Sequence, residues 1–185
     1  MRRPLFAFIP ATVFVAALSF PALGFGQNSD FNLNVHANSN VTAKDIGLPE
    51  YPGAVPYKDK DADSSSGDLS FLLNSFHFAV KAVSFVTTDS PEHVLDFYRM
   101  PLAKYGEVLE CNHGKSVGSL TRTKSGLTCG DSKGGHMTVS GSDGDHELRA
   151  GTPEQFRIVG VDRTDDGKTK LGLVSLILPK DDGKN

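Results

Sequence analysis

Four titratable side chains gather within five positions of the chain: Asp143, Asp145, His146 and Glu147. Carboxylates beside an imidazole can work as general acid and base in a hydrolase-like reaction, or can bind a cation. The glycines and the serine around them favour a solvated turn. We therefore predict no catalytic residue. A hydrolase-like enzyme that uses this cluster, or the base His93, is kept as an alternative function.

A second acidic group lies in a charged, serine-rich stretch that runs from Asp59 to Asp68. Asp59, Asp61 and Asp63 alternate as the first three ligands of an EF-hand loop do. The match then fails, because a serine stands where that loop requires glycine, and Ser70 stands where it requires the bidentate glutamate. We predict a solvated loop with no metal and no cofactor, and keep cation binding as an alternative.

The chain has two cysteines, Cys111 and Cys129. In an oxidising compartment a small, even number of cysteines predicts a structural disulfide. Together with His113 and His136 they offer ligands for a metal, but this spacing matches no closed zinc pattern. We therefore favour the disulfide.

Composition excludes several classes of partner. The formal net charge is −3, and loss of Arg2 and Arg3 with a signal peptide would change it to −5 (17 basic against 22 acidic residues). A mildly acidic chain argues against binding to nucleic acid, which needs a basic face. Tryptophan is absent, which excludes a carbohydrate cleft built on stacked indole rings. The sequence contains no G-x-S-x-G, HExxH, P-loop or CxxC motif.

The N-terminus has the pattern of a secretory signal peptide over residues 1–26. A short basic region precedes an almost wholly apolar run over 5–20, and small residues follow. A membrane span needs about 20 apolar residues, so we expect no stable span after cleavage. The mature protein is then exported, to the periplasm or outside the cell.

Four segments are expected along the chain. After the signal peptide comes a polar stretch, 27–47, which is predicted to be a flexible leader or an edge segment. Two prolines, Pro49 and Pro52, make a rigid turn at the start of a single domain over 48–180. Residues 181–185 form a polar tail.

One amphipathic helix, over about 90–105, is the clearest single element. Ser90 is suited to cap its N-terminus and Pro91 to occupy the first helical position. Five apolar side chains follow at spacings of three and four: Val94, Phe97, Tyr98, Leu102 and Tyr105. Because an internal proline costs about 3 kcal/mol, Pro101 predicts a kink or a break near Met100.

Alternating apolar residues predict strands at 69–76, 79–87, 107–111, 118–123, 136–140, 153–162 and 168–178, with a turn at 141–147. An Asp-Gly pair between the last two predicts a hairpin. The final strand is apolar on both faces, which is typical of a central strand. The expected fold is α+β: a mainly antiparallel sheet of six or more strands with one principal helix packed on one face.

Three short motifs carry a resemblance to a known family: Tyr51-Pro52-Gly53-Ala54, Phe85-Val86-Thr87-Thr88-Asp89-Ser90-Pro91, and Phe97-Tyr98-Arg99 with Leu102 and Gly106. The chain resembles a family of exported bacterial proteins of unknown function, which share a YPGA turn, a TxDSPE helix start and an FY…L…G helix. The resemblance implies a small α+β domain outside the cytoplasm and supplies no catalytic residue. Pro101 departs from the unbroken helix that the family pattern implies.

Together these features favour a non-catalytic binding or interaction module in the cell envelope. A sheet with one helix leaves part of its surface open. The expected partner is an unknown protein or envelope component, bound through that open sheet face.

Overall fold

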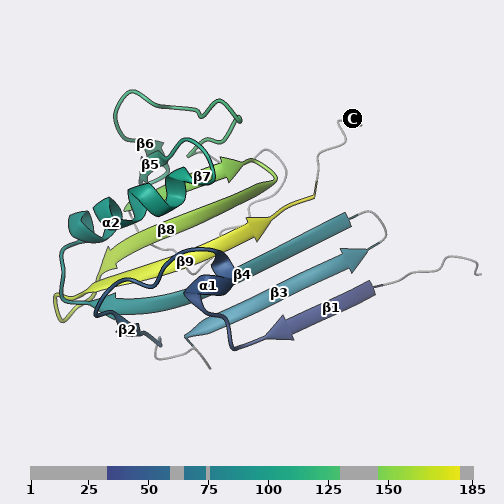
Figure 1. The fold of residues 1–185 in the computed structure, drawn as a ribbon, viewed down its shortest axis with the longest axis horizontal. Coiled ribbons are helices and arrows are strands. Elements are labelled where there is room, and N and C mark those ends of the chain that lie inside the picture. Colours follow the sequence, from purple (N-terminus) through teal and green to yellow (C-terminus); the bar gives the residue numbers. More distant parts are fainter. Residues whose placement is uncertain (1–32, 59–64, 74–75, 130–145, 180–185) are drawn as a thin grey trace, which may run out of the picture. The chain divides into compact units, whose positions relative to one another are not determined.

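An antiparallel sheet is the framework of this protein. In a computed structural model, which describes residues 33–58, 65–73, 76–129 and 146–179, nine strands form one sheet and every pairing is antiparallel (Figure 1). The order is β1-β3-β4-β9-β8-β7-β5-β6, with β2 beside β4. The predicted α+β fold with a mainly antiparallel sheet is confirmed. The strands are β1 (Leu33–Asn38), β2 (Val55–Pro56), β3 (Ser66–Leu73), β4 (Phe76–Thr87), β5 (Leu109–Asn112), β6 (Lys115–Ser116), β7 (His146–Thr152), β8 (Gln155–Arg163) and β9 (Thr169–Ile177).

The last strand, β9, lies between β4 and β8, as its two apolar faces predict. Leu171 and Leu173 belong to the main buried cluster, whereas Val174 and Leu176 belong to a second cluster that also contains Leu127. A strand that is buried on both sides cannot alternate apolar and polar residues. The β9 sequence therefore follows from its central place in the sheet.

Two helices, α1 (Ala43–Ile46) and α2 (Pro91–Ala103), contribute to the main core (Figure 1). The helical layer on this face of the sheet is therefore not formed by α2 alone. Val94, Tyr98 and Leu102 of α2 are buried there together with residues of β4, β7, β8 and β9, and the partly buried Phe97 and Tyr105 pack against them. The cluster consists of Val41, Ala43, Ile46, Leu48, Tyr51, Val83, Phe85, Val94, Leu95, Tyr98, Leu102, Leu148, Ala150, Val159, Val161, Leu171 and Leu173.

The helix α2 begins with a side-chain cap. Ser90 Oγ accepts a hydrogen bond from the backbone N–H of His93, and Pro91 is the first helical residue. The predicted break near Met100 is wrong, because the helix continues through Pro101 to Ala103. Leu102 is fully buried, and burial of a leucine stabilises by about 1.5–3 kcal/mol. That is comparable to the proline penalty of about 3 kcal/mol, so packing keeps the last turn helical.

The prediction that residues 27–47 form a flexible leader is wrong for the residues from 33 onward. β1 is the edge strand of the sheet, in agreement with the alternative of an edge segment, and α1 follows it. Thr42 and Asp45 form a capping box, and Ile46 is buried. The domain therefore begins before residue 48, and the described residues belong to one compact unit, Phe31–Asn185. The predicted signal peptide, 1–26, and the tail, 181–185, lie outside the described residues.

Two further corrections concern the strands. β7 begins at His146, although a turn was expected over 141–147. Leu148 and Ala150 lie in the main core and alternate with Glu147 and Arg149, so the two polar residues hide the strand pattern in the sequence. The predicted strand at 118–123 is absent from this described stretch, which holds one isolated bridge between Arg122 and Thr128. The predicted strand at 136–140 lies outside the described residues. Within the described part of the chain, neither helix has the length and apolarity that a membrane span requires.

The three family-like motifs meet in one cluster. Tyr51 of the YPGA turn donates a hydrogen bond to Asp89 Oδ2 at 2.6 Å, and its ring packs edge-on against Phe97 at 5.1 Å between centroids. Burial, together with the carboxylate of Asp89, raises the pKa of Tyr51 to about 12. Tyr98 completes the cluster by donating to the carbonyl of Pro49 at 3.0 Å. These motifs therefore have structural roles.

Substitution of Tyr98 by phenylalanine is expected to change how stability depends on pH. Burial, and to a lesser degree the nearby charge of Glu50, raises the pKa of Tyr98. The unfolded chain therefore loses this proton first, and its contribution to stability, full below pH 10, falls as the pH rises further. Urea denaturation between pH 8 and 11 should give a shallower alkaline loss in Tyr98→Phe. Stability at pH 7 should fall by about 1 kcal/mol because one hydrogen bond is lost.

The matched control is Tyr57→Phe, which removes a half-buried phenol directly after β2 and leaves Tyr98 in place. The control should keep the alkaline loss of the parent protein. Identical alkaline slopes in Tyr98→Phe and the parent protein would contradict the assignment.

Candidate functional site

The helix-bearing face of the sheet changes from apolar to polar along its strands. Cross-strand partners lie on the same face of an antiparallel sheet. Val159, Leu173 and Val83 are such partners and are buried in the main core. Two residues further along each strand, the partners form what we call the polar row: Arg157 of β8, Ser175 of β9, Lys81 of β4 and Asp68 of β3.

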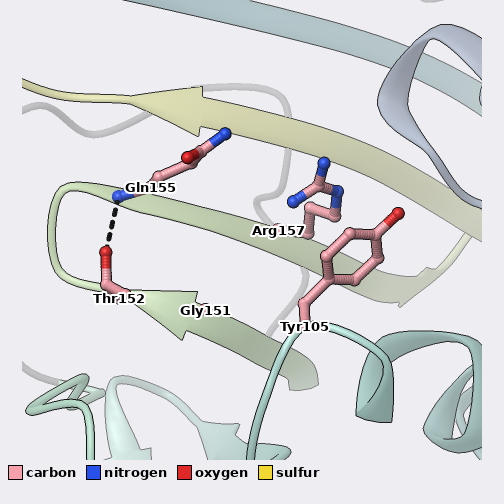
Figure 2. Close-up of a pocket in the computed structure, with 5 residues that line it drawn as sticks. All are labelled: Tyr105, Gly151, Thr152, Gln155 and Arg157. Carbon is pink, nitrogen blue, oxygen red and sulfur yellow. Dashed lines mark hydrogen bonds between the residues drawn. The ribbon is translucent and has the colours of Figure 1, made fainter.

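Arg157 is fixed by two contacts from outside the sheet. Its Nε donates to the carbonyl oxygen of Ile46 at 2.8 Å, at the C-terminal end of α1, where a helix has unpaired carbonyls. Its guanidinium carbon lies 3.5 Å from the centroid of the Tyr105 ring, a cation–π contact (Figure 2). Together these contacts hold the guanidinium in one orientation.

Tyr105 is itself held against the end of α1. Its hydroxyl donates to the carbonyl oxygen of Gly47 at 2.6 Å. Gly47 has a φ of +84°, and a Cβ built there would lie 2.4 Å from the Tyr105 hydroxyl oxygen. This position therefore requires glycine, for its backbone conformation and for the close approach of the phenol.

A cavity of about 260 Å³ lies beside Arg157 and is lined by Tyr105, Gly151, Thr152, Gln155 and Arg157 (Figure 2). Gln155 and Arg157 are two residues apart on β8, so their side chains lie on the same face. Thr152 Oγ1 accepts from the backbone N–H of Gln155 at 3.2 Å and closes the turn between β7 and β8.

The two positively charged residues of the polar row, Lys81 and Arg157, differ in whether a negatively charged group lies near them. Lys81 lies 3.8 Å from Asp68 and also interacts with Asp45, so its charge is compensated. Among the described residues, by contrast, no acceptor binds the two terminal nitrogens of Arg157, whose Nε alone donates a hydrogen bond. A half-buried guanidinium held in one orientation beside a cavity is suited to bind an anionic group.

A second charged cluster ties α2 to the sheet. Glu110 of β5 accepts from Arg99 Nη2 at 2.6 Å, and its other oxygen lies 2.6 Å from His146 Nε2. Burial alone would raise the pKa of Glu110, but the hydrogen bonds from Arg99 and His146 outweigh it and lower that pKa. Since each group has a charged partner, we interpret this cluster as a structural ion-pair network.

The predicted acid–base cluster is only partly described, and its described members point apart. His146 and Glu147 are neighbours on β7 and therefore lie on opposite faces of the sheet. Glu147 is bound by Arg149, through Nε at 2.7 Å and Nη2 at 2.6 Å; burial raises its pKa, although Arg149 opposes this. Asp143 and Asp145 lie outside the described residues. His93 is exposed on the first turn of α2.

The predicted cation loop is also only partly described, because Asp59, Asp61 and Asp63 lie outside the described residues. Asp68 is described, and one of its carboxylate oxygens is buried with no hydrogen-bond partner among the described residues. The described part of the chain contains no group of three or more side chains that could hold a metal.

The predicted disulfide is confirmed. Cys111 of β5 and Cys129 are bonded, with 5.6 Å between their Cα atoms, and they are buried together with Leu109. Arg149 Nη1 donates to the carbonyl of Thr128 at 3.3 Å, so the segment before Cys129 is linked to β7 as well as to β5.

Neither Arg157 nor Tyr105 is predicted as a site residue from the sequence. In the sequence, Arg157 is the polar member of the alternating run Phe156-Arg157-Ile158, which is the pattern of an ordinary solvent-facing strand residue. Such a pattern identifies no ligand by itself. Comparison of the chain with protein-family models, with curated proteins and with solved structures finds no match.

Proposed function

We propose that this protein is an exported, non-catalytic binding module of the cell envelope, and that it binds an unknown protein or envelope component through the polar row and the adjoining cavity. The observation that carries this proposal is the state of Arg157. Its orientation is fixed by Ile46 and Tyr105, and its terminal nitrogens have no acceptor among the described residues. Pre-organisation of this kind lowers the cost of binding.

Three observations support export, to the periplasm or outside the cell. Residues 1–26 have the pattern of a signal peptide. The disulfide between Cys111 and Cys129 favours an oxidising compartment. The YPGA, TxDSPE and FY…L…G motifs resemble those of exported bacterial proteins, and this resemblance favours the same location. As part of this proposal, we infer that the protein is a member of that family.

The arrangement of titratable groups supports binding over catalysis. A hydrolase-like enzyme needs its base and acid to converge at one reacting atom. His146 and Glu147 lie on opposite faces of the sheet, and each has a charged partner of its own. Cation binding by the stretch from Asp59 to Asp68 remains an alternative that the test below includes.

A melting-temperature screen of the disulfide-bonded protein tests this function. The panel holds organic anions, amines, neutral saccharides, and calcium with and without chelator. At about 100 times Kd, a ligand that binds only the native state stabilises it by about 2.7 kcal/mol. For a chain of this size that raises Tm by about 5–10 °C. We expect a rise with an anionic ligand that is lost in Arg157→Lys and kept in the control Arg163→Ala, an exposed arginine on the same strand.

Two outcomes would contradict the proposal. Turnover of ester, peptide or phosphoester substrates that His146→Ala abolishes would replace it with a hydrolase. A rise in Tm with calcium that chelator reverses, without any dependence on Arg157, would favour the cation-binding alternative.

A further inference from the structure

Beyond the polar row, the same face of the sheet becomes partly apolar. The next set of cross-strand partners is Gln155, Ile177 and Ala79, which we call the outer row. Each lies two residues from a member of the polar row along its strand, so the two rows share a face. Gln155 is exposed and Ile177 is half-buried. Arg157, which has no counter-charge among the described residues, therefore lies near an aliphatic side chain that solvent can reach.

We propose that this site binds a monocarboxylate that carries an apolar group; the inference rests on the proposed binding function. The carboxylate lies on the terminal nitrogens of Arg157, and the apolar group lies along Ile177 of the outer row. Ser175, the cross-strand partner of Arg157, and Gln155 of the outer row offer further donors on the same face.

The geometry of Arg157 favours a carboxylate. Its Nε is already bound to Ile46, and its guanidinium carbon lies over the Tyr105 ring, so the hydrogen-bonding capacity left for a ligand is that of the terminal nitrogens, which have no acceptor among the described residues (Figure 2). Two parallel N–H groups match the two oxygens of a carboxylate.

The charge balance favours a monoanion. Lys81 already interacts with Asp68 and Asp45, and among the described residues that line the cavity Arg157 is the one charged side chain. A phosphate dianion would bring a second negative charge that the single positive charge of Arg157 does not match. The cavity of about 260 Å³ is smaller than the 300–1,000 Å³ typical of drug-sized ligands. It therefore suits a carboxylate and the first carbons attached to it.

Two sources can supply this chemistry: a free carboxylic acid, or the C-terminal carboxylate of a peptide with an apolar last residue. Calorimetric titration of the disulfide-bonded protein distinguishes them. The probes are acetate, butanoate and hexanoate; hexylamine and hexyl phosphate; and one leucine-terminated peptide with a free or an amidated C-terminus.

We expect hexanoate or the free-acid peptide to bind, and hexylamine and the amidated peptide not to bind. Arg157→Lys keeps the positive charge but loses the pair of parallel N–H donors, and should weaken binding at least about tenfold. Arg163→Ala should bind as the parent protein does. Affinity should rise about fourfold for each added CH₂ group, and Ile177→Ser should flatten that dependence without affecting acetate. Circular dichroism and Tm of each variant verify that it is folded.

The outcomes separate the two proposals. Binding of hexyl phosphate that depends on Arg157, with no binding of any carboxylate, would overturn the carboxylate inference and leave the binding function standing. Carboxylate binding that is unchanged in a folded Arg157→Lys variant would overturn the inference. If no probe binds and the broader screen also shows no ligand that depends on Arg157, both proposals are overturned.

Discussion

Replacement of Gly151 by alanine is expected to destabilise the protein by at least about 3 kcal/mol, or to prevent folding. Gly151 ends the buried part of β7 with a φ of +133°, a conformation that side chains rarely allow. A Cβ there would lie 2.3 Å from the carbonyl oxygen of Gln155 and 2.7 Å from the Cα of Phe156. Both are backbone atoms of the paired strand β8, so relief of the clash requires the two strands to separate.

Two control variants divide this effect into its parts. Gly167→Ala introduces a side chain at a φ of +80° with no atom within 4 Å, and should cost about 1–2 kcal/mol. Gly67→Ala also meets no atom within 4 Å, and its φ is not in the left-handed range; its stability should change little. Urea denaturation of the three variants measures the series. A Gly151→Ala variant no less stable than Gly167→Ala would show that β7 and β8 tolerate the clash.

Removal of the disulfide by the double substitution Cys111→Ala and Cys129→Ala is expected to cost about 3 kcal/mol. The bond joins residues 18 apart. In the unfolded chain it reduces the conformational freedom of that loop, and this loss of entropy favours the folded state. Alanine avoids placing a hydroxyl at these buried positions.

The same quantity can be measured without mutation, since the parent protein in reducing agent should show a similar loss. The double variant is its own control, because reducing agent should leave its unfolding curve unchanged. A loss below about 1 kcal/mol would mean that native strain offsets the entropic gain. It would also mean that contacts such as that of Arg149 with Thr128 suffice to hold the loop in place.

Local signals account for the parts of the fold that the sequence predicts. The cap at Ser90 and the periodic side chains that follow define α2 within a few residues. The Asp-Gly pair at Asp166 and Gly167 connects β8 and β9, at nearly the expected boundaries. The disulfide follows from the presence of two cysteines in a chain with a signal-peptide pattern. Each of these features depends on residues close in sequence, or on cysteine chemistry.

The features that the sequence does not reveal depend on distant partners. Glu147 makes β7 look polar, and its burial is compensated by Arg149, a contact that requires the strand to exist. Likewise, Arg157 has the appearance of any exposed strand residue until Ile46 and Tyr105 are placed beside it. The strand order β4-β9-β8 depends on how much apolar surface the whole sheet buries. No short stretch of sequence determines that quantity.

The contact between Arg157 and Ile46 has a consequence for the order of folding. It joins residues 111 apart in the chain, and the central pairing of β4 with β9 joins Ala79 to Ile177. Contacts of such long range form slowly, because loop closure must precede any gain from them. Since α1 contacts β9 as well as β4, and Ile46 accepts from Arg157 of β8, the docking surface of α1 is incomplete until the last two strands have joined the sheet. The guanidinium site is then among the last regions to assemble, and a chain that ends before residue 157 lacks it entirely.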